Sequence, residues 1–130
     1  MREIRDHIVE GDSANHQLKI TVMDEPGAGG ANHEYEIDWS AGVPEGAKGH
    51  VKESTRVSFQ NGPIKEAGVN GATQEALLAI VIDRLRSFQT GPYGCRENAI
   101  ALTHCEDALM WLQRRTRARI ARGVEGTHQN

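Results

Sequence analysis

Hydrophobic residues recur at helical spacing through residues 73–122, and this pattern predicts a helical hairpin. In the first arm, residues 73–88, the apolar stripe is so wide that it needs cover on more than one side. The stripe consists of Leu77, Leu78, Val81, Leu85 and Phe88, and is widened by Ile80 and Ile82. We expect Thr73 to be the N-cap, because its hydroxyl can accept a backbone N–H of the first turn.

The segment Gly91-Pro92-Tyr93-Gly94 is expected to end the first arm, since proline and glycine do not continue a helix. A second, longer arm then runs from about Cys95 to Arg122, with a heptad-like seam. That seam is Leu102, Cys105, Leu109, Leu112, Thr116 and Ile120. Ile100 and Trp111 lie off the seam, which suggests a second buried face.

The N-terminal half shows the two-residue alternation that is typical of strands. Apolar side chains occupy every second position in residues 17–23, 33–39 and 55–59. The charged segment 1–10 is compatible with either a helix or an edge strand, and residues 40–53 are expected to form a loop. The sequence therefore predicts an α+β fold, in which a small N-terminal antiparallel β-sheet precedes a long antiparallel two-helix hairpin.

Charge is unevenly distributed over the parts of this predicted single domain. The parts are the sheet region 1–72, the hairpin 73–122 and a polar C-terminal tail 123–130. The whole chain carries a net charge of −3 and has a pI of about 6.1, yet five arginines lie within residues 114–122. Such concentrated positive charge suits a compact anion better than a nucleic-acid polymer, whose binders usually carry a broad basic face.

Arg115, Arg119 and Arg122 share one face of the predicted helix, because they are four and three residues apart. Cations near a helix C-terminus complement its dipole, and this accounts for part of the cluster, including Arg117 on the other side. Like charges on one face repel each other unless an anion lies among them. Because the planar guanidinium binds phosphate oxygens in a bidentate manner, the sequence predicts a phosphate site here.

Nothing in the residues gives positive evidence for catalysis, a cofactor or a metal ion. The six histidines show no ligand spacing, the glycine segment 27–30 lacks the Gly-Lys-Ser/Thr ending of a phosphate loop, and no nucleophile lies in a recognisable elbow. No window is apolar enough to span a membrane, and the charged start does not read as a signal peptide. Cys95 and Cys105 lie ten residues apart on one predicted helix and cannot pair, which predicts reduced, cytosolic thiols.

Long motifs are spread over residues 55–128. They are Phe59-Gln60-Asn61-Gly62-Pro63-Ile64-Lys65-Glu66, Gly68-Val69-Asn70-Gly71, Glu75-Ala76-Leu77-Leu78-Ala79-Ile80, Cys95-Arg96-Glu97-Asn98-Ala99, Ala108-Leu109-Met110-Trp111-Leu112 and Ala121-Arg122-Gly123-Val124-Glu125-Gly126-Thr127. In these motifs the chain resembles the first type of phage Thoeris anti-defence proteins. The helical hairpin of that family is shared with the phage anti-CBASS cyclic-oligonucleotide sponges.

The resemblance implies a non-enzymatic function. Such proteins sequester cyclic ADP-ribose isomers, among them glyco-cyclic ADP-ribose, which bacterial TIR-domain immune sensors make, so that the Thoeris effector is not activated. The resemblance also implies a homodimer that assembles further to a hexamer, and action in the host bacterial cytoplasm during infection. It implies a second site for cyclic di- or trinucleotides. No membrane and no long nucleic acid is expected as a partner.

Transferred by position, the resemblance implies two sets of binding residues. Phe88 would stack on the adenine, Asn98 would make polar contacts, and Arg115 and Arg119 would hold the pyrophosphate of the cyclic ADP-ribose isomer. The second site would be the turn that contains Arg122, Gly123, Val124, Gly126 and Thr127. Because Asn98 and Arg115 are roughly 25 Å apart along one helix, a pocket that contains both requires two antiparallel copies of that helix.

Two other functions remain open from the residues. A small regulatory or accessory phage protein could bind nucleic acid through the arginine-rich helix, and a steep loss of affinity with added salt would indicate it. An enzyme that degrades the cyclic nucleotide is a weaker alternative. Recovery of intact ligand from the heat-denatured complex would distinguish a sponge from such a hydrolase.

Overall fold

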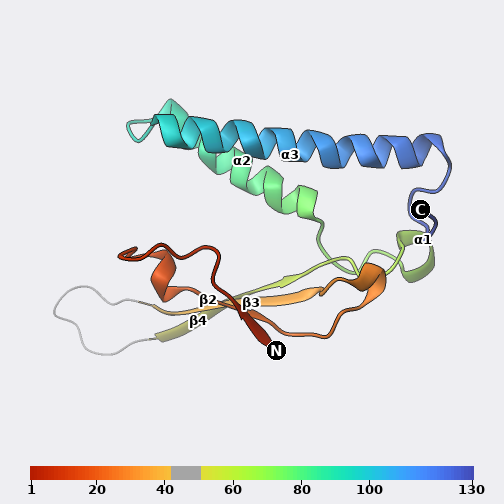
Figure 1. The fold of residues 1–130 in the computed structure, drawn as a ribbon, viewed down its shortest axis with the longest axis horizontal. Helices are drawn as coiled ribbons and strands as arrows, with labels where there is room; N and C mark the ends of the chain where they lie inside the picture. The colour runs from red at the N-terminus through yellow and green to blue at the C-terminus, as the bar shows by residue number, and fades with distance from the viewer. Residues whose placement is uncertain (42–50) are drawn as a thin grey trace. The chain divides into compact units, whose positions relative to one another are not determined.

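The computed structural model describes residues 1–41 and 51–130. These residues form two compact units, Met1–Asn61 and Gly62–Asn130, which we call the sheet unit and the hairpin unit. The first is built on a sheet and the second on helices, so the predicted α+β class is confirmed (Figure 1). Residues 42–50 of the predicted loop 40–53 lie outside the described residues, whereas residues 40–41 and 51–53 belong to strands, so the loop prediction is wrong at both ends.

The sheet unit contains one four-stranded antiparallel sheet in the order β1-β2-β3-β4. Its strands are β1 (Arg2–Ile4), β2 (Lys19–Val22), β3 (Glu34–Ala41) and β4 (Val51–Ser58), and two short 3-10 helices, η1 (Asn15–Gln17) and η2 (Ala28–Gly30), precede β2 and β3. The N-terminal segment, compatible in sequence with a helix or an edge strand, is therefore edge strand β1. Each strand pairs with its neighbour in sequence, which is the simplest antiparallel connection.

The strand register places the alternating apolar residues on one face of the sheet. Ile20 lies opposite Ile37, Val22 opposite Tyr35, and Tyr35 in turn opposite Val57. Residues directly opposite each other in a ladder point to the same side, so these side chains form one apolar surface. Val22 is the most buried of them, with 1% of its surface exposed.

The connection between β2 and β3 is held by Asp24, whose carboxylate accepts the backbone N–H groups of His33 and Glu34. Partial desolvation raises the pKa of the Asp24 carboxyl, but these hydrogen bonds outweigh it and the pKa lies below its ordinary value. Within the same loop, a Cβ atom on Gly27 would lie 3.2 Å from both His33 Nδ1 and Asn61 Oδ1. Gly27 is thus required by close packing against the His33 ring.

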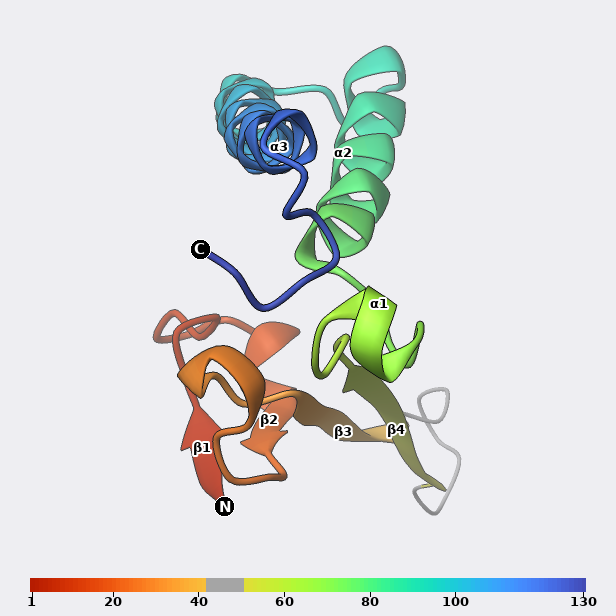
Figure 2. The same ribbon diagram turned by 90° about the vertical axis from the view of Figure 1, so that its right-hand side faces the viewer.

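The hairpin unit consists of the short helix α1 (Ile64–Ala67) followed by α2 (Gln74–Thr90) and α3 (Arg96–Ala121) (Figure 2). Thr73 caps α2 as predicted, because its Oγ1 accepts the N–H of Ala76 at 3.1 Å. The Gly91–Gly94 segment separates the two long helices, also as predicted. The sequence pattern did not indicate α1, whose single turn is too short to show a hydrophobic period.

Burial within the hairpin follows the predicted stripes with two corrections. Ile82, expected only to widen the α2 stripe, is its buried residue, since 3% of Ile82 is exposed against 43% of the stripe member Val81. On α3 the seam is partly buried from Leu102 to Thr116, but Ile120 is 59% exposed and Arg119 is the partly buried residue at that level. The reason is length: α3 has 26 residues and α2 has 17, so α3 continues beyond α2 (Figure 1).

We predict that Gly27→Ala lowers the free energy of unfolding of the sheet unit by about 1–3 kcal/mol, as overpacking usually does. The reason is that His33 is 6% exposed and its ring cannot easily move away from a new methyl group. Trp39 fluorescence during urea unfolding, in a Trp111→Phe background, measures the change. Ala31→Ser, in the same loop and on an exposed residue, is the control. An unchanged midpoint for Gly27→Ala would contradict the packing argument.

Candidate functional site

Arg119 holds the C-terminal turn of the chain against the end of α3. Its guanidinium donates hydrogen bonds to the carbonyl oxygens of Val124 at 2.9 Å, Thr127 at 3.0 Å and Gln129 at 2.6 Å. These bonds use three of the five N–H donors of the guanidinium. Arg119, for which the resemblance implies a pyrophosphate contact, therefore also determines the shape of the segment that follows the helix.

The same turn is packed against α1. The carbonyl oxygen of Gly126 accepts the N–H of Lys65 at 2.9 Å, and a Cβ on Gly126 would lie 3.2 Å from Lys65 Cγ. Val124 is buried, and His128 Nδ1 lies 2.7 Å from a carboxylate oxygen of Glu66. Three residues of the predicted second site, Val124, Gly126 and Thr127, are thus part of one ordered turn.

The other arginines of the cluster have different surroundings. Arg114 lies over the ring of Trp111, with 5.1 Å between its guanidinium carbon and the ring centroid. Arg122 donates a hydrogen bond to the carbonyl oxygen of Asn130. Arg115 is exposed, and among the described residues its guanidinium has neither an ion pair nor a hydrogen bond. Arg115 therefore keeps all five donors available for an anion.

Phe88 and Asn98 lie at the other end of the hairpin, on either side of its connecting loop. Phe88 is 38% exposed, and the guanidinium carbon of Arg84 lies 5.4 Å from its ring centroid. Asn98 is the third residue of α3, and its backbone N–H is directed to Cys95 Sγ at 3.5 Å. The N–H of Cys95 is in turn bound by Gln89 Oε1 at 3.0 Å. Gln89 thus connects the end of α2 to the start of α3.

One chain does not bring the four predicted residues of the first site together. Asn98 and Arg115 belong to the same straight helix and are roughly 25 Å apart along it. Phe88 and Asn98 form one half of the set near the hairpin loop, and Arg115 and Arg119 form the other half near the C-terminus of α3. A single nucleotide-sized ligand therefore cannot contact both halves of one chain.

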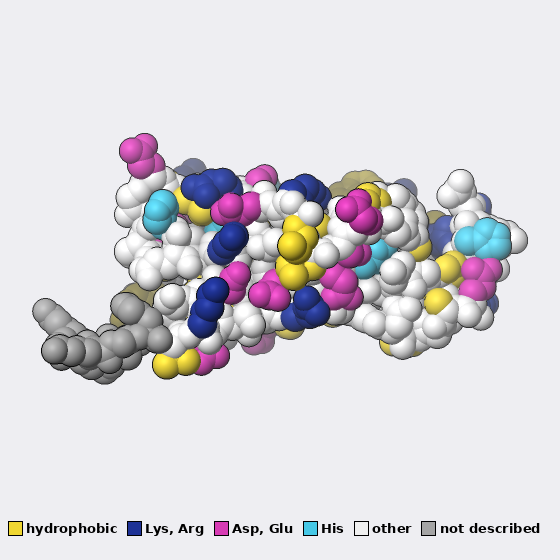
Figure 3. Space-filling model, turned by 90° about the horizontal axis from the view of Figure 1, so that it is seen from below, with side chains coloured by type: hydrophobic (Ala, Val, Ile, Leu, Met, Phe, Trp, Pro, Cys, Tyr) yellow, Lys and Arg dark blue, Asp and Glu magenta, His cyan; other side chains and the backbone are white. Residues whose placement is uncertain are grey.

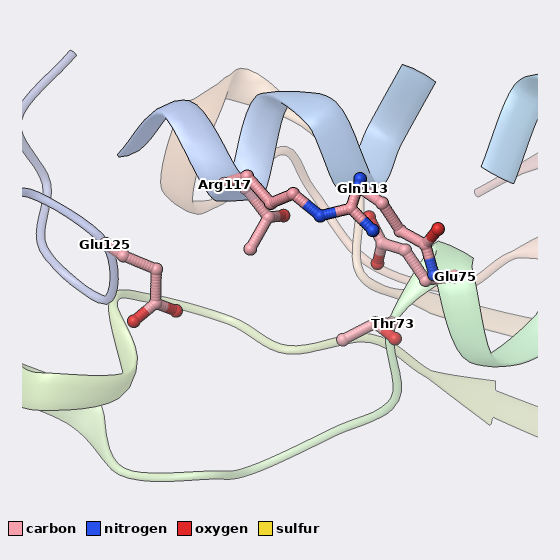
Figure 4. Close-up of a pocket in the computed structure, with 6 residues that line it drawn as sticks. Thr73, Glu75, Gln113, Arg117 and Glu125 are labelled. Atoms are coloured by element: carbon pink, nitrogen blue, oxygen red, sulfur yellow. The ribbon is translucent and has the colours of Figure 1, made fainter. Parts of the chain in front are cut away.

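A pocket of about 370 Å³ lies at the base of the hairpin, where the first turn of α2 meets the last third of α3. It is lined by Thr73, Glu75, Gln113, Thr116, Arg117 and Glu125, all of which belong to the hairpin unit (Figure 4). Sequence reasoning missed this pocket. Glu75 and Arg117 are 42 positions apart in the chain, and no local pattern indicates that they lie near each other.

Neither a metal cluster nor a membrane helix is found in the described part of the chain. No group of three or more His, Cys, Asp or Glu side chains in residues 1–41 and 51–130 is arranged to hold a metal ion. None of the described helices is both long enough and apolar enough to cross a bilayer.

A helical hairpin with an arginine-rich end, preceded by a small antiparallel sheet, defines a hairpin-type α+β protein. The model of the Acb2/Tad1, hairpin domain family matches residues 52–117, which is just over half of the chain, and the chain belongs to this family. The chain is also 56% identical over 73 residues to Thoeris anti-defense 1 of Bacillus phage SBSphiJ7. That match covers 56% of this chain and 51% of the relative, so the chain spans about half the length of the relative it matches. The resemblance seen in the sequence motifs is confirmed.

We predict that Arg119→Ala releases the C-terminal turn and leaves the helices intact. The variant loses three hydrogen bonds that hold the turn. The N–H of Lys65 donates to Gly126 in the turn, and the N–H of Thr127 donates to Val124. Amide hydrogen exchange at both residues should therefore become at least about tenfold faster. Hydrogen exchange followed by NMR measures this. Arg115→Ala is the matched control, and equal protection in the two variants would show that Arg119 does not hold the turn.

Proposed function

We propose that this chain is a non-enzymatic sponge that sequesters cyclic ADP-ribose isomers, with glyco-cyclic ADP-ribose as the expected ligand. In the cytoplasm of an infected bacterium it would remove the signal made by TIR-domain sensors, so that the Thoeris effector stays inactive. The observation that carries the proposal is the 56% identity to a protein named Thoeris anti-defense 1, in a chain of the hairpin family. The free guanidinium of Arg115 provides matching chemistry for a pyrophosphate.

The two arginines of the proposed first site contribute unequally. Arg115 offers a complete guanidinium, whereas Arg119 has at most two free N–H donors while it holds the turn. Arg115 is therefore the main pyrophosphate ligand in this proposal. Arg119 adds charge and one or two bonds. Phe88, which is partly exposed, is the stacking surface for the adenine, and Asn98 supplies polar contacts.

A homodimer makes such a pocket geometrically possible. Two antiparallel copies of α3 would place Asn98 of one copy near Arg115 of the other, and two-fold symmetry would then produce two equal pockets. The single chain leaves Ile80, Trp111 and Ile120 largely exposed, and a second copy would cover apolar surface of this kind. Assembly of dimers into a hexamer is part of the same proposal.

The second proposed site is the turn of Arg122, Gly123, Val124, Gly126 and Thr127, with a cyclic di- or trinucleotide as its ligand. Gly123 and Gly126 both have positive φ, and nothing lies within 4 Å of the position that a Cβ on Gly123 would take, so the backbone there is open to a phosphate. Support for a preformed site comes from Arg119 and Lys65, which hold the turn in one shape. Binding there would cost little ordering entropy.

Calorimetric titration with a panel of cyclic ADP-ribose isomers and cyclic oligonucleotides tests the proposed function. Saturable binding of one isomer, followed by recovery of the intact ligand after heat denaturation, is the expected result. Recovery of a cleaved product would identify a hydrolase, and absence of binding to every isomer would refute the sponge proposal.

A nucleic-acid-binding accessory protein is the second candidate, and the arginine cluster is the observation that favours it. Figure 3 shows Lys and Arg side chains interspersed with Asp and Glu on the face seen from below in Figure 1. Against this candidate, the whole chain carries a net charge of −3 and has a pI of about 6.1, without the excess of basic residues that nucleic-acid binders usually carry. The salt dependence of binding separates the two candidates, since a polymer binder releases many counterions.

We predict that Arg115→Ala weakens binding of the cyclic ADP-ribose isomer by roughly ten- to a hundredfold. Hydrogen bonds to charged groups contribute about 1.5–3 kcal/mol each, and about 1.4 kcal/mol corresponds to a factor of ten. Arg115→Lys should recover only part of the loss, because lysine keeps the charge without the fork. Arg117→Ala, on another side of α3, is the control measured by the same titration. Equal, slight losses for Arg115→Ala and Arg117→Ala would favour the nucleic-acid candidate.

We also predict that Gln89→Leu weakens binding of the cyclic ADP-ribose isomer by about tenfold. Gln89 Oε1 accepts the N–H of Cys95, and Cys95 Sγ accepts the N–H of Asn98. The variant loses the first of these acceptors, and the start of α3 at Asn98 is then held less firmly. Gln89→Glu keeps an acceptor and should bind within about threefold of the wild type. Thr90→Val removes a hydrogen bond at the same helix end without touching the loop and serves as control. Titration that gives wild-type affinity for Gln89→Leu would exclude a positioning role.

A further inference from the structure

The pocket at the base of the hairpin collects polar side chains from three separate segments. Glu75 comes from the first turn of α2, Gln113 and Arg117 come from α3, and Glu125 comes from the C-terminal turn. Figure 4 shows the Arg117 side chain extending from α3 toward Gln113 and Glu75, while Glu125 lines the pocket from the turn, apart from these three side chains. Its volume of about 370 Å³ falls in the range of small-molecule sites.

The hydrogen-bonding groups that remain for a ligand can be identified by elimination. Thr73 Oγ1 accepts the N–H of Ala76 and keeps its own proton to donate, whereas Thr116 Oγ1 donates its proton to the carbonyl oxygen of Leu112 and can only accept. Arg117 forms no ion pair within the described residues, although two carboxylates line the same pocket. The pocket therefore offers one guanidinium, one amide, two carboxylates, the hydroxyl donor of Thr73 and the hydroxyl acceptor of Thr116.

This set of groups is selective for a ligand that has both anionic acceptors and hydroxyl or amino donors. A bare phosphate would be attracted by Arg117 but repelled by Glu75 and Glu125, whose charges together exceed that of the arginine. A nucleotide can offset this repulsion, since its phosphate oxygen accepts from Arg117 while its ribose hydroxyls donate to the carboxylates that a bare phosphate could only repel.

The pocket is continuous in sequence with the proposed second site, because Glu125 lies between Val124 and Gly126 of the turn. We propose that the pocket is a nucleotide subsite of that second site, in which Arg117 binds a phosphate oxygen and Glu75 and Glu125 accept ribose hydroxyl protons. This inference rests on the proposed function of the turn. It gives Arg117 a ligand-binding role in place of the dipole complement expected from the sequence.

The first test compares Arg117→Ala with Arg114→Ala in calorimetric titrations with cyclic triadenylate. Both changes remove one arginine from α3, but Arg114 lies over Trp111 and does not line the pocket. Arg117→Ala should lose at least about tenfold in affinity. Arg114→Ala should stay within about threefold of the wild type, and neither variant should lose affinity for the cyclic ADP-ribose isomer.

The second test uses the 2′-deoxy analogue of cyclic triadenylate. The wild type should bind the ribose form more tightly, and the double variant Glu75→Gln/Glu125→Gln should reduce that preference. If the wild type binds cyclic triadenylate but Arg117→Ala binds it equally well, or if the wild type does not distinguish ribose from deoxyribose, the subsite is refuted and the turn site survives. If the wild type binds no cyclic oligonucleotide, the turn site and its subsite both fail, while the cyclic ADP-ribose site is unaffected.

Discussion

The difference in length between the two long helices determines the structure of the C-terminal part of the chain. α3 has 26 residues against 17 in α2, so its last turns extend past the helix that would otherwise pack on them. At this level a seam continued by Ile120 would have no apolar partner on α2. The chain instead places Arg119 there and folds its own C-terminal segment back onto it. The hydrogen bonds from Arg119 to three carbonyl oxygens make that return stable.

The arrangement also reduces the repulsion among five arginines in nine residues. Arg119 faces carbonyl oxygens, Arg114 faces the Trp111 ring, Arg122 binds the C-terminal backbone, and Arg117 lies in a pocket with two carboxylates. Each of these neighbours carries partial or full negative charge toward the guanidinium. Among the described residues, Arg114, Arg119 and Arg122 thus have a direct partner, whereas the guanidinium groups of Arg115 and Arg117 have neither an ion pair nor a hydrogen bond. An anion that approaches α3 consequently meets two guanidinium groups without partners, those of Arg115 and Arg117, instead of five.

The sequence predicted the helices and strands well where a periodic pattern persisted. It predicted burial and side-chain partners less well, because these depend on tertiary contacts. Alternation identified β2, β3 and the second half of β4 but left β1 open between helix and strand, and the N-cap at Thr73 and the Gly91–Gly94 break set the helix boundaries. Val81 and Ile82 were harder to distinguish, because an arm that is apolar most of the way round does not define its own inner face. The bonds of Arg119 to the turn and the pocket around Arg117 could not be predicted. Each depends on residues distant in sequence, and the sequence does not show that the chain brings these residues back to α3. The close packing of Gly27 on His33 likewise depends on a tertiary contact that no motif encodes.

A sink for a signalling nucleotide needs less from its binding groups than an enzyme does. An enzyme must bind the transition state more tightly than the substrate, whereas sequestration depends only on ground-state affinity and on the number of sites. A guanidinium on a rigid helix and a turn held in one shape supply affinity of this kind, because little conformational entropy is lost when the ligand binds. Under the proposed function, separate sites for the two ligand classes would also let one chain retain both ligands at once. An abundance of one signal would then leave the capacity for the other unchanged. In a single shared pocket, the two signals would compete.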